Sequence, residues 1–555
     1  MRREEILQLP EQSKKLARLS WRDAAVVLFS GTCFLLFHRV HIPNPDEGLI
    51  LAAAERILLN QIPFRDFFSE LGPGSFYIHA LLLRVTGNSV ASLGWTVWAL
   101  GVVMVWLLYR LTIQIVDGAA AFAPPLVLTT ICYPYVYFVS HHWWGSLFFL
   151  LMLLFLTKHY VRTTRQNRIW ATSSLFTSGI FAALAFLCMQ PVGVLGIGAV
   201  LCWFFLAGRA GGRSWRNSVH LGLVRAFWFL LGTVAILGLT AVYFWRHGAL
   251  GAWVYDNFTF LFTNYRGYEN SPGPYSWERL VRLFKWVIRE PSIQNGYFIA
   301  GYYFFAVAAP AIGFSGAIWQ IRGNWAKGDS RAPLLMLYLL AGWAALLSEM
   351  HNSSLLNLIY ASPVILILFV NAWNDACCFW PRSRRLLLVA AGLVFAVVVT
   401  AAFRRAIHST EFSTPVQTRR GTFYCSPDEA THVGLWINAI QHAVPTGGEA
   451  FFFPYAPQFY FLTATHNPTE FDTVVSGFHT RQQIGEAIST LQAGPPGLYV
   501  FSFDKVRVRT PRDHLPDDPL DYESPGIVER SLLAPDSHFN KAGEVAGMEI
   551  WVHER

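Results

Sequence analysis

Apolar runs of about 17 to 25 residues, each long enough to cross a bilayer as a helix, recur through the first 405 positions of the chain. Helices suit this environment because all their backbone groups are paired within the segment. Only 14% of the 555 residues are charged, whereas about 25% are charged in a typical soluble domain. The sequence therefore predicts a polytopic α-helical membrane protein.

The basic residues between these runs indicate how the chain is oriented. Loops on the cytoplasmic side of a membrane are enriched in Lys and Arg. Basic clusters occupy 14–22, 158–168, 209–216, 322–331 and 382–385. We expect a cytoplasmic N-terminus and an external side that carries the 41–88 and 246–296 loops. The net charge of +8 is then an orientation signal, and nucleic acid is not an expected partner.

The number of spans follows from parity. The 41–88 loop is expected outside and the basic 158–168 loop inside, so an odd number of spans, three, must connect the two loops. Four apolar runs lie in this part of the sequence, so one of them cannot be a span. The run 72–86 is the shortest and carries His79 and Arg84, so we interpret it as a helix in the membrane interface. About eleven spans result: 23–40, 90–113, 119–139, 143–157, 170–188, 191–208, 220–245, 297–319, 333–348, 355–373 and 386–403.

Residues 406–555 have the composition of a soluble domain. DEATHVGLWINAIQHAV predicts an amphipathic helix capped by Ser426 or Asp428. QFYFLTAT and TRQQIGEAISTLQ are typical of helices, and EAFFFPYA, GLYVFSFD and MEIWVHE of strands. The expected organisation is a transmembrane catalytic domain over 1–405 and a small external (periplasmic) α/β domain over 406–555. No glycine-rich phosphate loop follows any of these strands, so nucleotide binding is not indicated.

The loop 41–88 is unusually charged for its place directly after the first apolar run. Pro45-Asp46-Glu47 predicts the start of a helix of about 15 residues with Ile50, Ala53 and Ile57 on one face. The local pattern favours Asp46 as the helix cap. The loop context favours the alternative, a carboxylate at the membrane surface that can reach a lipid-linked molecule on one side and an aqueous one on the other.

The order of one span, PDE at the start of an external helix, and then FRDFFSELGPGSFYIHALLLR resembles the GT-C class of integral-membrane glycosyltransferases. The similarity is greatest to the bacterial family 39-like branch, which holds the protein O-mannosyltransferases and the lipid A aminoarabinose transferase. PYAPQFYFLTATHNPTEFD at 454–472 is also similar to the external domain of bacterial members.

This resemblance implies an inverting hexosyl- or pentosyltransferase of the inner (plasma) membrane. Its donor is a polyprenyl-phosphate sugar, and its acceptor is a hydroxyl of a protein, lipid or glycan. Asp46 takes the role of general base, and Glu47 beside it is the second catalytic candidate. The chemistry is sound in itself, because a carboxylate can accept the hydroxyl proton while cationic or hydrogen-bonding groups meet the leaving phosphate.

Candidates for binding substrate or phosphate lie on the loops expected outside: Arg65, His142, His351, Arg266 and Lys285. The related enzymes often have an Asp near position 141, and this chain has His141-His142 there. A divalent metal on Asp46, His142 and His351 is possible by ligand chemistry but not favoured, because the resembled branch is generally regarded as metal-independent. We expect no cofactor.

Two alternatives stay open. A transporter or flippase of lipid-linked sugars predicts charged residues inside the spans and internal repeats. The predicted spans are nearly free of carboxylates, and we see no repeat. A catalytically inactive relative that acts in envelope assembly is favoured by the missing Asp near position 141 and disfavoured by the intact Asp46-Glu47 pair.

Overall fold

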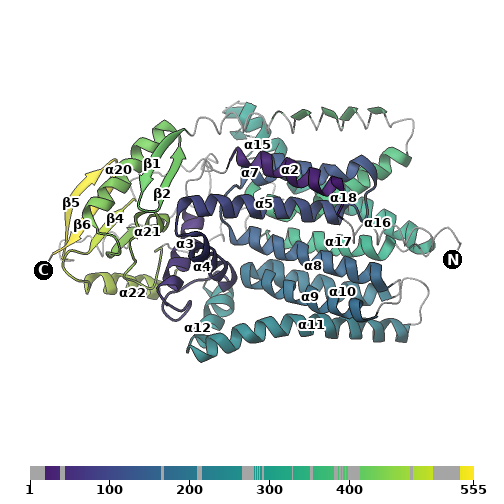
Figure 1. Cartoon of the computed structure of the whole chain (residues 1–555), viewed down its shortest axis with the longest axis horizontal. Helices are drawn as coiled ribbons and strands as arrows, with labels where there is room; N and C mark the ends of the chain where they lie inside the picture. Colours follow the sequence, from purple (N-terminus) through teal and green to yellow (C-terminus); the bar gives the residue numbers. More distant parts are fainter. Residues whose placement is uncertain are drawn as a thin grey trace.

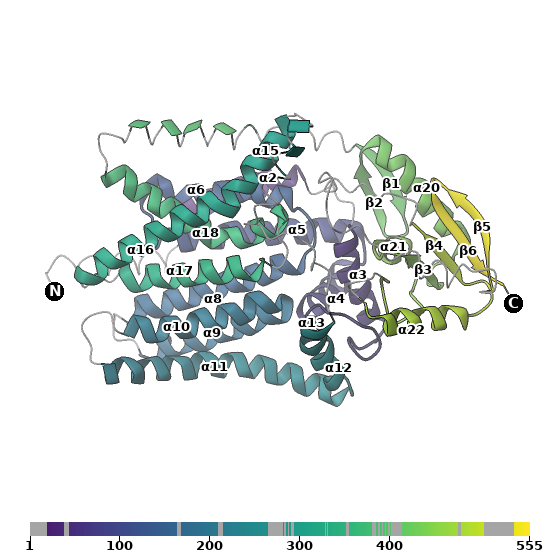
Figure 2. The same ribbon diagram turned by 180° about the vertical axis from the view of Figure 1, so that it is seen from behind.

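A computed structural model of the chain describes residues 19–37, 44–163, 168–208, 215–264, 293–327, 331–350, 354–379, 413–474, 479–503 and 538–554, with single positions between them. Seven helices in this part are long and apolar enough to cross a membrane: Val90–Thr112 (α5), His141–Val161 (in α8, His141–Thr163), Gln190–Ala207 (in α10, Gln190–Gly208), Trp215–Arg246 (α11), Phe298–Trp325, Arg331–Ser348 (α17) and Leu355–Phe379 (α18). They form an elongated bundle (Figures 1 and 2), which confirms the predicted membrane fold.

The other predicted spans differ in detail. Helices α2 (Trp21–Leu35) and α9 (Arg168–Cys188) pack in the bundle, α2 against α5 and α9 against α8 and α11. The stretch predicted as one regular span at 119–139 changes type repeatedly. It runs through a 3-10 helix (Gly118–Phe122), α6 (Ala123–Val127), a π-helix (Leu128–Cys132) and α7 (Tyr133–Tyr135). Prolines 124, 125 and 134 lack the amide hydrogen that a regular helix needs there. The predicted span 386–403 lies largely outside the described residues.

Two short helices, α3 (Pro45–Leu58) and α4 (Pro73–Thr86), lie at the end of the bundle that faces the C-terminal domain (Figures 1 and 2). Helix α4 has 14 residues and is not one of the helices long enough to span. Its side chains Leu81, Arg84 and Val85 are exposed. Apolar side chains beside a cation at the bundle end agree with the predicted interface helix.

The C-terminal domain is built on a four-stranded sheet of order β3-β4-β6-β5, formed by Ala450–Phe453, Tyr499–Ser502, Met548–His553 and Phe539–Val545. β3 and β4 are parallel, and the other two pairs are antiparallel. A separate hairpin joins β1 (Thr414–Thr418) to β2 (Gly421–Cys425). The strands expected in EAFFFPYA, GLYVFSFD and MEIWVHE are therefore present, whereas β1, β2 and β5 were not predicted.

Helices cover both faces of this sheet because neighbouring strand residues point to opposite sides. Phe451 and Phe453 pack with α22 (Arg481–Gln492). Phe452 packs on the other side with α20 (Pro427–Ala443) and α21 (Gln458–Thr463). Ser426 caps α20 with Glu429 in a capping box, which confirms one of the two predicted caps.

Buried ion pairs hold the C-terminal domain against α3. Arg56 donates from Nε and Nη2 to Asp472 Oδ1 at 3.0 and 2.8 Å, and from Nη2 to the Thr469 carbonyl at 2.7 Å. Arg420 pairs with Glu55 on the same helix. We call these two ion pairs, Arg56–Asp472 and Arg420–Glu55, the clamp.

Candidate active site

The N-terminus of α3 presents Asp46 at the bundle end. Asn44 caps this helix, with its side-chain oxygen 2.9 Å from the Glu47 amide nitrogen, so the expectation that Asp46 is the cap is wrong. Asn44, and not Asp46, is the cap because Pro45 occupies the first helical position and Asn44 directly precedes it. The Asp46 carboxylate is exposed and has no capping duty, although the helix N-terminus still favours its negative charge.

A tyrosine of the C-terminal domain reaches Asp46. The Tyr455 hydroxyl donates to Asp46 Oδ1 at 2.5 Å. Tyr455 lies between β3 and α21, and α21 packs on α3. Gly48 permits this approach, since a Cβ at that position would be 2.3 Å from the Gln458 nitrogen. The two domains thus meet within two residues of Asp46.

Glu47 points away from Asp46 into the protein. Its side chain is fully buried, and Oε1 accepts the Val139 amide hydrogen at 3.0 Å. Val139 belongs to the connection that precedes α8 and leads to His142. Glu47 therefore links the helix that carries Asp46 to the connection just before α8, the helix in which His142 lies.

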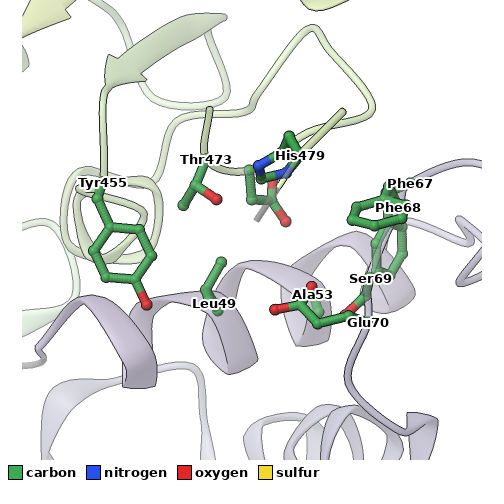
Figure 3. A pocket seen from close by; sticks show the side chains of 10 residues that line it. Leu49, Ala53, Phe67, Phe68, Ser69, Glu70, Tyr455, Thr473 and His479 are labelled. Carbon is green, nitrogen blue, oxygen red and sulfur yellow. The ribbon is translucent and has the colours of Figure 1, made fainter. Parts of the chain in front are cut away.

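A pocket lies beside Asp46, between α3 and the C-terminal domain. Its walls are formed by Leu49 and Ala53 of α3, Phe67, Phe68, Ser69 and Glu70 of the first loop, and Tyr455, Asp472, Thr473 and His479. Figure 3 shows the Glu70 carboxylate directed into this pocket and the Tyr455 ring on its opposite side. Burial raises the pKa of Glu70, and the nearby Asp46 carboxylate raises it further.

A second carboxyl group lies behind Glu70. Asp256 is buried in the π-helix Tyr255–Thr259. Burial raises its pKa to about 8, helped by Glu70 and Glu470 and opposed by a hydrogen bond from the Ser69 backbone. Glu70 thus has the Asp46 carboxylate on one side and Asp256 on the other.

Polar contacts from two other connections fix the Ser69-Glu70 backbone. Gln190 Nε2 donates to the Glu70 carbonyl at 3.0 Å and to Asn257 Oδ1 at 3.2 Å, and Asn257 Nδ2 donates to the Ser69 carbonyl at 3.3 Å. The first loop, the start of α10 and the segment after α11 therefore meet at one place. All three belong to connections that the sequence predicts on the external side.

His142 stands in a network of its own at the same end of the bundle. Its Nδ1 lies 3.0 Å from Glu349 Oε1, and Asn357 Nδ2 donates to Glu349 Oε2 at 3.1 Å. The imidazole stacks on Tyr360 at 4.5 Å between ring centroids. When Glu349 accepts this hydrogen bond, the imidazole carries its hydrogen on Nδ1. A carboxylate therefore stands beside this turn, supplied by the end of α17 in place of an Asp near position 141.

The other predicted phosphate ligands are placed less favourably or lie outside the described residues. Arg65 donates to both oxygens of Asp66 at 2.8 Å and to the His247 carbonyl at 3.1 Å. Lys285 is exposed. Arg266 and His351 lie outside the described residues. Within the described part, no group of three or more His, Cys, Asp or Glu side chains is arranged to hold a metal ion.

Sequence reasoning missed Tyr455, Glu349 and Asp256 as members of this region. Glu349 was visible as an acidic residue in the same external turn as His351. Tyr455 stands in the segment that carries the family resemblance of the C-terminal domain, but nothing local connects it to Asp46. Asp256 stands near the start of the second predicted external loop, where an isolated carboxyl gives no signal of burial.

Comparisons with known proteins agree with this architecture. No family model and no curated protein sequence matches the chain. The structure of ArnT from Cupriavidus metallidurans in the apo state is similar with a TM-score of 0.57 and 14% identity, over 96% of this chain and 97% of that one. The same protein bound to undecaprenyl phosphate gives 0.55 and 13% over the same shares. The oligosaccharyltransferase of Archaeoglobus fulgidus in the apo form gives 0.52 and 12%, over 86% of this chain and 69% of that one. The chain has the GT-C fold of these membrane glycosyltransferases.

Proposed function

We propose that the chain is an inverting glycosyltransferase that moves a sugar from a polyprenyl phosphate to a hydroxyl acceptor at the external face of the membrane, with Asp46 as general base. The observation that carries this proposal is the position of Asp46. It is an exposed carboxylate free of capping duty, held at the junction between a membrane bundle and a soluble domain. The fold it shares with ArnT, which was solved with undecaprenyl phosphate, supports a lipid-phosphate donor.

The reaction has one bond-forming and one bond-breaking event. The acceptor oxygen attacks the anomeric carbon while Asp46 takes the hydroxyl proton. The bond from the anomeric carbon to the phosphate oxygen breaks, and its electron pair leaves with the lipid phosphate. Attack opposite the leaving group inverts the anomeric centre. The end of the bundle suits this geometry, because a lipid donor and an aqueous acceptor can approach from different sides.

The leaving phosphate needs hydrogen-bond donors or cations. We propose His142 for this role, together with Arg266, Lys285 and His351 of the same predicted external side. Arg65 is a weaker candidate, since a phosphate must displace its own Asp66 partner. Glu47 has a supporting role here, because its buried carboxylate joins α3 to the turn before His142.

The test is transfer from a panel of radiolabelled polyprenyl-phosphate hexoses and pentoses by membranes that contain the full chain. Asp46→Asn should express and fold normally but lose at least about 100-fold in rate, which is the usual scale for removal of a general base. Asp117→Asn is the control: Asp117 is exposed beside Arg331, away from the site, and its loss should leave the rate unchanged. Normal transfer by Asp46→Asn, or no transfer by the wild type from any donor, contradicts the proposal.

A further inference from the structure

The hydrogen bond between Tyr455 and Asp46 connects the soluble domain to the proposed base. We infer that Tyr455 is a positioning residue that orients the Asp46 carboxylate, so that the C-terminal domain is a working part of the active site. This inference rests on the proposed function of Asp46. An O–H donor at 2.5 Å from a carboxylate oxygen has the geometry of a strong, charge-assisted hydrogen bond.

The backbone that carries Tyr455 is fixed on both sides. Before it, Phe453 ends the buried strand β3, and its carbonyl accepts the Phe503 amide hydrogen at 2.8 Å. The Pro454 carbonyl accepts the amide hydrogen of Val474 at 3.1 Å. After it, the segment runs into α21, which touches α3 at Gly48. Tyr455 and Asp46 are therefore presented by elements in direct contact, and the hydroxyl has little freedom to leave the carboxylate.

The clamp is a second connection between α3 and the C-terminal domain, away from Asp46. Arg56 and Asp472 are both nearly buried, with 8% and 7% of their side chains exposed. Arg56 lies ten residues after Asp46 on α3, and Asp472 follows Tyr455 in the C-terminal domain. The two domains thus meet at Gly48 and again at the clamp, and this fixes the direction from which Tyr455 approaches Asp46.

Asp46 stands near other acids, so the direction of its carboxylate matters. The Asp46 charge raises the pKa of Glu70, and Glu47 of the same helix points into the protein. Asp472 and His479 line the pocket beside Asp46. The hydrogen bond from Tyr455 directs the Asp46 carboxylate toward the C-terminal domain.

The same bond leaves the other carboxylate oxygen available. Tyr455 donates to Oδ1, and the structure shows no contact to Oδ2 from the described residues. A base that is held through one oxygen presents the second at a fixed angle to the acceptor hydroxyl. This is an arrangement for orientation, and Tyr455 does not itself need to touch the reacting atoms.

The decisive test is the infrared carboxylate band of Asp46 in Tyr455→Phe. Difference spectra of the full chain in lipid nanodiscs, with Asp46→Asn used to assign the band, report the hydrogen bonds that this carboxylate accepts without any substrate. Tyr455→Phe should shift the band, because the carboxylate loses its donor. Tyr424→Phe is the matched control: it removes a half-buried tyrosine hydroxyl of the same domain, from strand β2, and should leave the band unchanged.

Kinetics provide the second readout. With the donor that the panel identifies, Tyr455→Phe should transfer about 10-fold more slowly at neutral pH, with an unchanged KM for the donor, because the base is held less well. If Tyr455→Phe does not fold, 3-fluorotyrosine at position 455 keeps the shape with a more acidic hydroxyl, and the Asp46 band should shift in the direction opposite to that expected for the loss of the donor.

The outcomes separate the two ideas. An unchanged Asp46 carboxylate band in Tyr455→Phe or in the fluorotyrosine protein overturns the inference, even if the rate falls, because a tyrosine that does not hold this carboxylate leaves its band alone. If Asp46→Asn is inactive while Tyr455→Phe behaves as wild type, the proposed base stands and only the inference fails. If Asp46→Asn transfers normally, the proposed function fails whatever Tyr455 does.

Discussion

The clamp and the pocket beside Asp46 lie along the same interface between α3 and the C-terminal domain, and they give their carboxyl groups different neighbours. In the clamp, Asp472 and Glu55 each face an arginine, although burial still raises the pKa of Glu55 to about 7. Glu70 in the pocket and Asp256 near it stand close to other carboxyls, and burial raises the pKa of both. A carboxyl with a cation as its partner can hold an interface together, whereas one among other acids is more readily protonated. The difference indicates which part of the interface is structural and which part is available for chemistry.

The largest effect should come from breaking the clamp. Arg56→Met leaves Asp472 as a nearly buried carboxylate without its cation, which should cost about 3–5 kcal/mol. Thermal unfolding of the purified full chain in detergent measures this loss. The double variant Arg56→Met/Asp472→Leu should recover most of the stability, since an apolar pair can replace a buried ion pair. Arg84→Met, on the exposed face of α4, is the control, and an Arg56→Met protein as stable as this control would break the comparison.

A smaller effect of opposite sign is expected at Asp256, near the Glu70 side of the pocket. The pKa of Asp256 is raised from 3.8 to about 8, so the folded protein holds a proton there that the unfolded chain has released. This contribution to stability is complete below about pH 4 and is lost as the pH rises through about 8. Asp256→Asn mimics the protonated form, so it should melt like wild type near pH 4 and about 2–4 °C higher at pH 8.5.

Asp66 provides the contrast for this prediction. Its hydrogen bond with Arg65 lowers the pKa of Asp66, so its contribution is present above the pKa of the unfolded chain and is lost as the pH falls. Asp66→Asn should therefore melt slightly lower than wild type at pH 7, and the difference should shrink in acid. A difference for Asp256→Asn that does not grow with pH would show that Asp256 is ionised in the folded protein.

The smallest effect concerns Glu47, the neighbour of Asp46 that faces the opposite way. Glu47→Gln keeps an oxygen for the Val139 amide hydrogen, so it should change stability by less than about 1 kcal/mol and the transfer rate by less than about threefold. Glu47→Leu removes the acceptor and should cost about 1–3 kcal/mol. A loss of activity in Glu47→Gln as large as that of Asp46→Asn would instead make Glu47 a catalytic partner.

Local features of the fold were predictable because they depend on nearby residues. The apolar runs indicated a membrane bundle, and the 3.6-residue periodicity placed α3 and α20 within a few residues. The error at the start of α3 is also local. Pro45 marks the first helical position, so the residue before it is the better cap, and Asn44 is a good capping residue. The prolines at 124, 125 and 134 were a visible warning that 119–139 is not a regular helix.

The partners of the site were not predictable from such patterns. Tyr455 is 409 positions from Asp46, Asp472 is 416 from Arg56, and Glu349 is 207 from His142. Each pairing exists because helix and strand packing brings two distant turns together. No periodicity or short motif records which polar residue on one turn faces which residue on another.

The sequence alone therefore determined that this chain crosses a membrane. It also predicted which loops lie on the external side, and it showed a pair of carboxylates, Asp46 and Glu47, in the first of these loops. Hydropathy, charge bias and helix periodicity carry this information, and all three are properties of short segments. Only the tertiary structure decided that Asp46 is exposed and Glu47 buried, and that a tyrosine of the C-terminal domain holds the former. Which neighbouring carboxyl is exposed beside Tyr455 and which faces a backbone amide depends on how α3 is rotated against its neighbours, and that rotation is set by packing at Gly48 and at the clamp.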